Sequence, residues 1–391
     1  MANSRQIHLT KAKKGKNDEF YTQWSDIEKE VNAYIEYNPD VFRGKTILLP
    51  ADDPFESNFF KFFATKFNEF GIKKLIATSF APSPIVNTQL SLLPEIVPDV
   101  ELGFSNNQMK SAYKIELTEV VDEDETGTIN IEDVIRRLQK ERDLIDSGQK
   151  SNILSYLNGD DNPDGINSFS AGDFRSNEVT LLRDEADMII TNPPFSLFRE
   201  FLSWINPLEK QFLIIGNMNA ITYKEVFPLI KENKIWLGTG MGRWISGFIV
   251  PETYELYGTE ARIENGNRIV ATNNALWMTN IDHGKRHQHL SLMTMEDNIK
   301  FSKHKNVKGH KYSTYDNFDA IEVPYTDAIP SDFSGIMGVP ISFLDKYNPE
   351  QFEIIGCSYD YGRPNGWAKD INMSVSINGV SVYKRLLIKK K

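Results

Sequence analysis

Four short apolar runs, separated by amphipathic segments, give residues 45–217 the pattern of an α/β protein. The apolar runs are rich in aliphatic residues and have the length of buried strands: KTILLP (45–50), KKLIATSF (73–80), ADMII (186–190) and QFLIIGN (211–217). Two segments between them place apolar residues at helical spacing: SNFFKFFATKFNEFG (57–71) and SLFREFLSWI (196–205). A strand, a helix and a second strand in this order predict a parallel, right-handed unit. The pattern as a whole predicts an open α/β sheet with helices on both faces.

An earlier helix is expected over residues 21–37, which read YTQWSDIEKEVNAYIEY. Ser25 is a candidate N-cap because Glu28 follows three residues later, which is the spacing of a capping box. The helix over residues 57–71 ends in Gly71, which fits a C-cap because glycine adopts the left-handed conformation without strain.

A long excursion separates the second strand from the third, and we expect residues 81–168 to be an inserted α+β segment. YKIELTEVV (113–121) has a strand pattern, and INIEDVIRRLQKERDLI (129–145) is an amphipathic helix. The insertion should therefore have its own hairpin and helix. Its six acids between Glu116 and Glu125 make it a poor candidate for facing phosphates.

The last third of the chain has a different pattern, which predicts a β-rich C-terminal module. Short strand-like runs are separated by turn residues: KIWLGTG (234–240), SGFIVPETYELYG (246–258), RIVATNNALWMTNI (268–281) and the segments after Ser331. The predicted organisation is therefore a flexible basic arm at 1–16, an α/β domain at 17–280 and a further module at 281–391.

The distribution of charge limits the partners of these parts. The net charge is −10, so no global basic field recruits nucleic acid. Basic residues concentrate locally, in the first 16 residues, in 285–311 with seven basic against two acidic residues, and in 384–391. Cys357 is the only cysteine, which excludes an intrachain disulfide framework and a cysteine zinc site. With no apolar stretch long enough to span a bilayer and no signal-peptide pattern, we expect a cytoplasmic protein.

TNPPFS (191–196) directly follows one of the buried runs, and its two prolines force the chain to turn there. In open α/β sheets, ligands bind outside the carboxyl ends of the strands. The Asn192 side-chain oxygen and the Pro193 carbonyl are two acceptors, which suits the two hydrogens of an exocyclic amine on a base. Holding both hydrogens would orient the nitrogen lone pair and disperse the developing positive charge. Phe195 would stack on the base, which must first leave its duplex.

This asparagine–proline–proline–phenylalanine sequence resembles the catalytic motif of amino-methyltransferases that use S-adenosylmethionine, in the form typical of adenine N6. KNDEFYT (16–22) is similar to the N-terminal motif that packs on the methionine part of the cofactor. DDPFESNFF (52–60) and GVPISFLDKYNPEQFEIIG (338–356) resemble the EcoRI modification methylase family of adenine-specific DNA N6-methyltransferases. The resemblance implies a Rossmann-like methyltransferase sheet in residues 17–280 and a DNA target-recognition module in residues 281–391.

The resemblance also implies the residues of the active site. The catalytic set is Asn192, Pro193, Pro194 and Phe195. The cofactor set comprises the N-terminal motif, the turn after the first strand, the end of the second strand and the GDF sequence: Phe20, Tyr21, Thr22, Pro50, Asp52, Asp53, Ser57, Asn58, Thr78, Asp173 and Phe174. Asp173 would accept a hydrogen bond from the adenine N6 amine of the cofactor, and Phe174 would pack on its ring.

Two departures from the family pattern concern the cofactor. The second strand ends in Thr78 and Ser79, where an acid usually binds the ribose hydroxyls, so the ribose partner is unassigned. The usual glycine-rich loop is missing, because ADDPFES contains no glycine.

Double-stranded DNA is the implied substrate, and a restriction endonuclease that acts on the same site is an implied partner. The expected phosphate contacts lie in the basic part of the module, where a solvated loop is the competing interpretation: Lys285, Arg286, His287, Lys303, Lys305, Lys308 and Lys311. His283, His287 and His289 have a spacing that could suit a metal, but amino-methyl transfer needs none, and no metal site is expected. Cys357 does not follow a proline, as a cytosine-C5 nucleophile usually does, and is expected to be a buried, inert thiol.

Three alternatives stay open on the sequence. The same chemistry could act on another planar amine, namely cytosine N4, an RNA adenine or a protein glutamine; the basic segments favour nucleic acid. A sequence-specific DNA-binding protein with an inactive methyltransferase domain is supported by the missing glycine loop and opposed by the intact TNPPF. A structural scaffold has no positive sequence feature.

Overall fold

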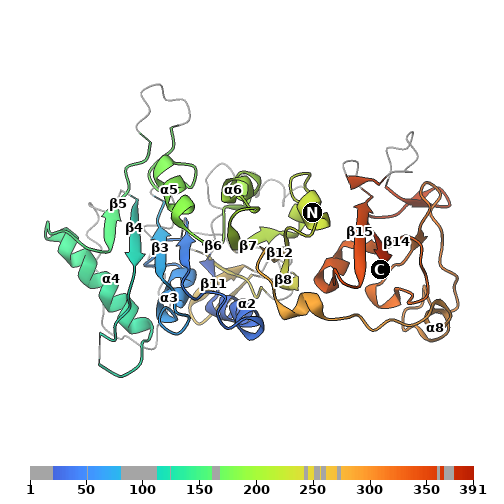
Figure 1. The fold of residues 1–391 in the computed structure, drawn as a ribbon, viewed down its shortest axis with the longest axis horizontal. Coiled ribbons are helices and arrows are strands. Elements are labelled where there is room, and N and C mark those ends of the chain that lie inside the picture. The colour runs from blue at the N-terminus through green and yellow to red at the C-terminus, as the bar shows by residue number, and fades with distance from the viewer. Residues whose placement is uncertain are drawn as a thin grey trace. The chain divides into compact units, whose positions relative to one another are not determined.

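The computed structural model describes residues 21–50, 52–80, 112–123, 125–160, 168–241, 245–250, 256, 261–270, 274–358, 362–364 and 374–391. The chain divides into two compact units: the first contains residues 1–217 and 242–281, and the second contains residues 218–241 and 282–391. The predicted basic arm, Phe20 and residues 81–111 of the predicted insertion lie outside the described residues. Figure 1 shows the elements of each unit.

The first unit is built on a large mixed sheet, and the predicted α/β class is confirmed (Figure 1). Its central strands lie in the order β3-β2-β6-β7, and all three neighbouring pairs are parallel. Antiparallel strands extend the two sides, with β4 and then β5 beyond β3, and β12 beyond β7. The bounds are β2 Thr46–Leu49, β3 Lys74–Thr78, β4 Tyr113–Leu117, β5 Leu154–Tyr156, β6 Met188–Thr191, β7 Gln211–Asn217 and β12 Ala275–Thr279. The four buried runs of the sequence are thus the four parallel strands.

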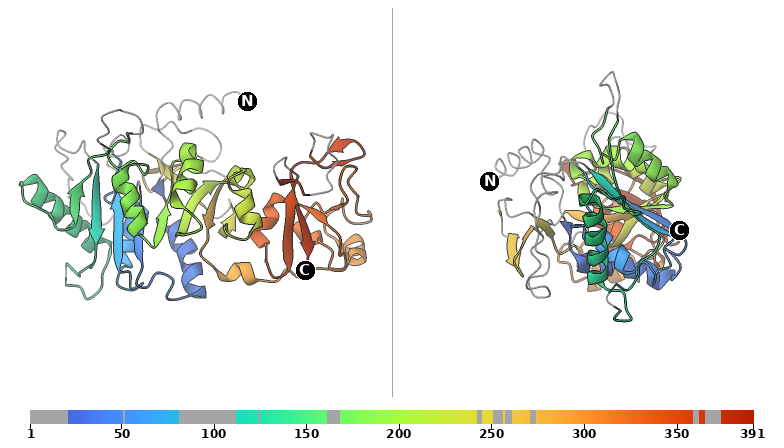
Figure 2. Two further views of the ribbon diagram at one scale, coloured as in Figure 1. Left: turned by 45° about the horizontal axis from the view of Figure 1, so that its top comes forward. Right: turned by 90° about the vertical axis from the view of Figure 1, so that its left-hand side faces the viewer.

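Helices cover both faces of this sheet, as the alternation of side chains along each strand requires (Figures 1 and 2). Ile47 and Leu75 belong to a core cluster with apolar residues of α2 and α3. Leu48 and Ile189 are equally buried but point to the opposite face, where α5 and α6 lie. The helix bounds are α2 Trp24–Tyr37, α3 Asn58–Thr65, α4 Ile131–Asp146, α5 Asn177–Glu185 and α6 Phe198–Ile205.

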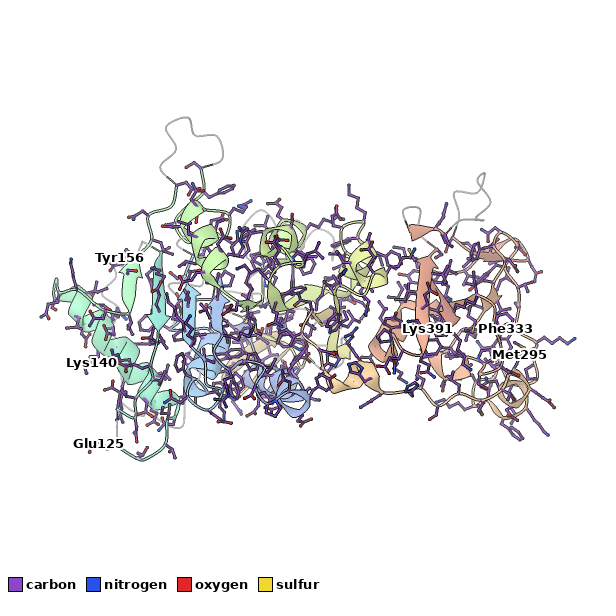
Figure 3. The ribbon with its side chains drawn as sticks, in the orientation of Figure 1. Glu125, Lys140, Tyr156, Met295, Phe333 and Lys391 are labelled. Carbon is purple, nitrogen blue, oxygen red and sulfur yellow. The ribbon has the colours of Figure 1, made fainter. Side chains whose placement is uncertain are left out.

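In the described part of the predicted insertion, the strands join the main sheet and do not form a separate hairpin, so the prediction was wrong for this part. β4 pairs antiparallel with β3, and β5 pairs with β4, so both strands widen the main sheet. Ile115 and Leu117 are buried in the same cluster as Leu75, which gives β4 an apolar face to share with the sheet. Between the two strands, α4 confirms the predicted helix and begins at a capping box. In Figure 3, Lys140 lies on α4 and Tyr156 on β5.

Two helix ends differ from the prediction. Helix α2 begins after Gln23, and Ser25 lies inside its first turn, because Tyr21 and Thr22 form a short strand, β1. Helix α3 ends at Thr65, and Gly71 (φ +63°) lies in the turn that leads to β3. Strand β1 belongs to a second sheet of the first unit, in the order β1-β9-β11-β10. Its other strands are β9 Phe248–Val250, β10 Ala261–Glu264 and β11 Asn267–Val270.

The second unit is rich in short strands, as predicted for the C-terminal third. Its main sheet has the order β13-β14-β18-β15, and β16 pairs with β17. The strand bounds are β8 Trp236–Met241, β13 Ile321–Glu322, β14 Met337–Pro340, β15 Phe352–Cys357, β16 Ser376–Ile377, β17 Val380–Ser381 and β18 Arg385–Lys390. The α-helices are α7 Phe227–Lys231 and α8 Met295–Phe301. Cys357 is fully buried in β15, which confirms the predicted burial of this thiol.

Short 3-10 helices connect several of these elements. They are η1 Phe195–Leu197, η2 Met218–Thr222, η3 Gly284–His287, η4 Thr326–Ala328 and η5 Ile341–Lys346. Within the part of the chain that the structure describes, every helix is too short or too polar to cross a membrane.

Candidate functional site

The strand order of the central sheet in the first unit changes direction between β2 and β6. From β2 the chain passes through α3 to β3 on one side, and it later returns to β6 on the other side. Such a switch point is where open α/β sheets bind their ligands, outside the carboxyl ends of the strands. The Thr191 hydroxyl at the end of β6 donates to the Pro50 carbonyl at 3.0 Å and also contacts the Asp52 carboxylate. The structure therefore brings the predicted cofactor turn and the predicted catalytic motif together.

The glycine-free turn after β2 is held by hydroxyl groups from three different elements. Ser57, the N-cap of α3, donates to Asp52 at 2.8 Å. Tyr113 of β4 donates to Asp53 at 2.5 Å, and Tyr21 of β1 donates to Glu56 at 2.6 Å. Each carboxylate of the turn is thus oriented by a side chain. This arrangement fixes the loop without the close backbone approach that a glycine-rich loop would need.

Burial shifts the pKa values of the ionisable side chains in and next to this turn. Burial raises the pKa of Asp52 to about 7, against the hydrogen bonds from Thr191 and Ser57. Burial and, second, the nearby charge of Asp53 raise the pKa of Glu56 to about 8. Lys61 on α3 is only 6% exposed, and burial lowers the pKa of its ammonium group to about 8. A turn with three carboxylates near one buried ammonium group suits a cationic ligand.

The N-terminal motif lies against the same region. Asn58, the first residue of α3, donates its side-chain amide to the Thr22 carbonyl at 2.9 Å. Thr22 pairs with Phe248 in the β1–β9 ladder, and the Phe248 ring lies edge-on to Phe195, with 6.1 Å between the ring centroids. The Thr22 hydroxyl is buried and meets no hydrogen-bond partner among the described residues. Tyr21, Thr22, Asn58 and Phe195 therefore converge as the sequence predicted, although their contact with a cofactor stays a prediction.

The catalytic motif makes the predicted turn at the end of β6. Pro193 and Pro194 are buried, whereas Asn192 and Phe195 are partly exposed. The Pro194 carbonyl accepts from the Leu197 amide at 3.0 Å, which starts η1. Within the described chain, no backbone amide donates to the Pro193 carbonyl.

The GDF sequence lies against the carboxyl end of β3, next to the buried Thr78. Gly172 has φ +76°, and a Cβ there would lie 2.0 Å from the Ser79 carbonyl oxygen, so only glycine fits. The Glu178 carboxylate anchors the turn by accepting from the amides of Gly159 at 3.0 Å and Gly172 at 3.3 Å. Asp173 is thereby placed at the edge of the sheet where the loops after β2 and β6 begin.

The two predicted cofactor residues of this turn are both buried. Asp173 is 6% exposed and accepts from the Arg175 guanidinium. Phe174 is 3% exposed, and its ring centroid lies 5.0 Å from that of Phe201 and 5.5 Å from that of Trp204. The ring is thus enclosed by aromatic side chains of α6, and its predicted contact with the adenine of the cofactor stays a prediction.

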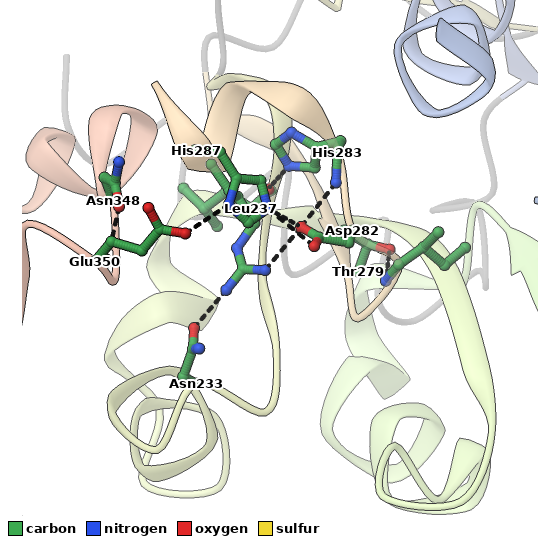
Figure 4. Close-up of polar contacts among 10 residues, drawn as sticks. Asn233, Leu237, Thr279, Asp282, His283, His287, Asn348 and Glu350 are labelled. Atoms are coloured by element: carbon green, nitrogen blue, oxygen red, sulfur yellow. Dashed lines mark hydrogen bonds and ion pairs between the residues drawn. The ribbon is translucent and has the colours of Figure 1, made fainter. Parts of the chain in front are cut away.

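In the second unit, the first three predicted phosphate contacts are engaged within the protein, and Figure 4 shows His287 between Asp282 and Glu350. Arg286 is 7% exposed, donates to Asp282 at 2.9 Å, and lies 3.6 Å from the centroid of the Trp236 ring. His287 bridges the carboxylates of Asp282 and Glu350, and the hydrogen bond with Asp282 raises its pKa. Lys285 donates at 2.6 Å both to the Thr239 carbonyl and to Asp345.

These contacts indicate that Lys285, Arg286 and His287 stabilise the second unit, which the sequence did not predict. The remaining predicted contacts are exposed and follow α8 in one segment: Lys303, Lys305, Lys308 and Lys311. Lys303 pairs with Asp327 at 2.8 Å. Among the described residues, no three His, Cys, Asp or Glu side chains are arranged to hold a metal ion.

Several residues of the site were missed by sequence reasoning. Glu56 lies within the predicted turn and could have been identified as a third acid of the loop. Tyr113 and Arg175 carried no sequence signal, because Tyr113 lies 60 residues from its partner Asp53 and the role of Arg175 depends on a side-chain fork.

Comparison with known proteins gives consistent matches over almost the whole chain. The family model described as adenine-specific methyltransferase EcoRI matches residues 8–391. The chain is 44% identical to the Type II methyltransferase M.EcoRI of Escherichia coli, over 98% of this chain and 96% of that protein. It is 28% identical to the Type II methyltransferase M.MpnI of Mycoplasma pneumoniae, over 98% of each chain. It is 31% identical to M.MgeORF184P of Mycoplasma genitalium, over 98% of this chain and 99% of that protein. No solved structure matches.

Proposed function

Because this chain belongs to the adenine-specific methyltransferase EcoRI family and is therefore an adenine-specific DNA methyltransferase, we propose that its first unit binds S-adenosylmethionine and a flipped adenine at the carboxyl ends of β2 and β6. The first unit is then a Rossmann-like methyltransferase domain. Membership of an adenine-specific family removes cytosine N4 as the target. The observation that carries the proposal is the Thr191 hydroxyl, which joins the turn after β2 to the NPPF motif.

The residues at this edge of the sheet fit the proposed cofactor. S-adenosylmethionine supplies an electrophilic methyl group on a positively charged sulfonium. Asp52 and Asp53 are buried and Glu56 is partly buried, and all three have raised pKa values, so a nearby cation such as the sulfonium or the ammonium group of the methionine part would favour their ionised forms. Asp173 can accept from the adenine N6 amine, and Thr22 has a buried hydroxyl that is available to a ligand. The ribose partner has no assigned residue.

The catalytic motif positions the target amine in this proposal. The Asn192 side-chain oxygen and the Pro193 carbonyl accept its two hydrogens, so that the nitrogen lone pair is directed toward the electrophile. Both acceptors also stabilise the positive charge that develops on the nitrogen. Phe195 stacks on the flipped base. The methylated ammonium is strongly acidic and loses its proton to water, so no buried base is required.

The second unit is the proposed target-recognition module for double-stranded DNA. Its exposed lysines after α8 supply phosphate contacts, and binding should weaken steeply with salt. Lys285, Arg286 and His287 make hydrogen bonds within the unit, so the proposal rests on the four exposed lysines, and a phosphate contact by these three stays a prediction. A restriction endonuclease with the same recognition sequence is the proposed partner, since the relatives are Type II methyltransferases. Action on genomic DNA implies a cytoplasmic location.

The test separates cofactor binding from catalysis. Purified protein is titrated with S-adenosylmethionine by calorimetry and then assayed for N6-methyladenine in plasmid DNA. We expect Asn192→Ala to bind the cofactor as the wild type does and to lose about 10²–10³-fold in kcat. Asn177→Ala, an exposed asparagine at the start of α5, is the matched control and should keep full activity. A wild-type protein that binds DNA but no cofactor would instead be an inactive DNA-binding member of the family.

A further inference from the structure

We propose that Arg175 is a positioning residue of the cofactor site, which fixes the Asp173 carboxylate in place and leaves it a single acceptor position for the exocyclic amine of adenosine. The inference rests on the proposed function, in which Asp173 accepts from that amine. In this proposal Arg175 makes the site selective for the purine base. A purine with an amine at the 6-position binds, and a purine with a carbonyl there binds much more weakly.

The Asp173 carboxylate is held by three donors from one residue. The Arg175 backbone amide donates to Oδ1 at 2.9 Å, and its Nε donates to the same oxygen at 3.0 Å. Its Nη2 donates to Oδ2 at 2.8 Å. Two parallel side-chain bonds fix the plane of the carboxylate as well as its position, which a lysine cannot do.

The remaining capacity of the carboxylate can be counted. An ionised carboxylate has about four acceptor positions, two on each oxygen. The Arg175 amide and Nε occupy both positions of Oδ1, and Nη2 occupies one of Oδ2. One position of Oδ2 is left for a donor from a ligand. The exocyclic amine of adenine is such a donor.

The remaining acceptor position of the Asp173 carboxylate selects for a ligand that donates a hydrogen bond. Asp173 is 6% exposed, and the Arg175 guanidinium is the cation paired with its carboxylate, at 2.8 Å. An ionised carboxylate only accepts hydrogen bonds, so a purine with a carbonyl at the 6-position would place two acceptors against each other. A neutral carboxyl group could donate to that carbonyl, and the selectivity would be lost.

Arg175 is itself fixed by its surroundings. Its Nη1 donates to Glu200 of α6 at 3.0 Å. Its guanidinium carbon lies 4.6 Å from the centroid of the Phe169 ring and 5.4 Å from that of Phe174. The path of the turn is determined separately, by Gly172 against the Ser79 carbonyl and by the Glu178 carboxylate. Removing the Arg175 side chain should therefore change the carboxylate more than the backbone.

The experiment compares two neutral cofactor products that differ at the 6-position of the purine. S-adenosylhomocysteine and S-inosylhomocysteine are titrated by calorimetry into the wild type, Arg175→Ala and Arg175→Lys. We expect the wild type to prefer the adenosyl compound by at least about 100-fold, because sites built around a buried hydrogen bond discriminate more strongly than apolar pockets do. The ratio should fall below about tenfold in Arg175→Ala and lie between these values in Arg175→Lys. Glu200→Gln, which removes only the outer partner of the guanidinium, should keep the wild-type ratio.

The ratio of the two affinities is the decisive readout, because a general loss of packing would weaken both ligands equally. Arg175→Ala with an unchanged ratio overturns the role of Arg175. If that variant does not fold, Arg175→Lys keeps the charge without the fork, and an unchanged ratio there overturns the proposal as well. A wild-type protein that binds neither compound would instead contradict the proposed function.

Discussion

Gly172 offers the sharpest structural perturbation of the proposed cofactor site. Its φ is +76°, and an added Cβ would lie 2.0 Å from the Ser79 carbonyl oxygen and 2.9 Å from the Ala112 Cβ. Close carbon–oxygen contacts in proteins are about 3.3 Å, so in Gly172→Ala the GDF turn must move by about 1 Å from the end of β3. The carbonyl is part of the backbone at the end of a strand and cannot rotate away.

The expected cost has two parts. A non-glycine residue in the left-handed region costs about 1–2 kcal/mol. Forcing an extra carbon into a packed site costs about 1–3 kcal/mol more. Gly172→Ala should therefore lower the free energy of unfolding by about 2–5 kcal/mol. The shift also displaces Asp173, so the affinity for S-adenosylhomocysteine should fall at least about tenfold, which corresponds to 1.4 kcal/mol.

Gly148→Ala is the matched control, because Gly148 has φ +80° and an added Cβ there meets no atom within 4 Å. It should lose only the conformational part, about 1–2 kcal/mol, and keep the affinity for the ligand. Chemical denaturation and calorimetry measure both quantities on both variants. Equal losses of stability in the two variants, with full affinity in Gly172→Ala, would refute the close approach of the GDF turn to β3.

Three further predictions concern charges that the structure buries or exposes. Because burial raises the pKa of Asp52 from 3.8 to about 7, its protonated form stabilises the fold, and this contribution is lost as the pH rises through about 7. The wild type should thus lose stability relative to Asp52→Asn as the pH rises from about 4 to about 7, the interval between the two pKa values. Parallel pH profiles in denaturant titrations would contradict the burial. Arg286→Lys, which loses a buried fork and the stacking on Trp236, should destabilise the second unit by about 3 kcal/mol. Lys308→Ala should leave thermal stability unchanged and reduce the slope of log K against log salt concentration for DNA binding by about 1. A loss of stability in Lys308→Ala, or a reduced salt slope with full stability in Arg286→Lys, would contradict these roles.

The central strands and the catalytic motif were predictable because their signals are local. A parallel strand buried on both faces reads as a continuous apolar run, and the turn at its end is marked by two prolines. The GDF glycine could also be identified, although the reason for it, the Ser79 carbonyl, appears only in the folded chain.

The side-chain contacts that hold the site in place were not predictable, because they join residues that are distant in sequence. Tyr113 belongs to a segment that the sequence indicates to be an insertion, yet β4 pairs with β3 of the main sheet and brings the Tyr113 hydroxyl to Asp53. The basic sequence at residues 285–287 has the composition of a phosphate contact. Arg286 also donates to Asp282 and packs on the Trp236 ring, and composition does not reveal such a structural role.

The most direct test of the central claim is the methylation state of DNA in a cell that makes this protein. The wild type is expressed in a bacterial host free of DNA methylation, and the genomic DNA is sequenced by a method that detects N6-methyladenine. The account predicts methylated adenines in one fixed sequence context, and unmodified DNA from cells with the Asn192→Ala protein. Unmodified adenines in cells that contain soluble wild-type protein would contradict it, as would the same methylation pattern in cells with Asn192→Ala.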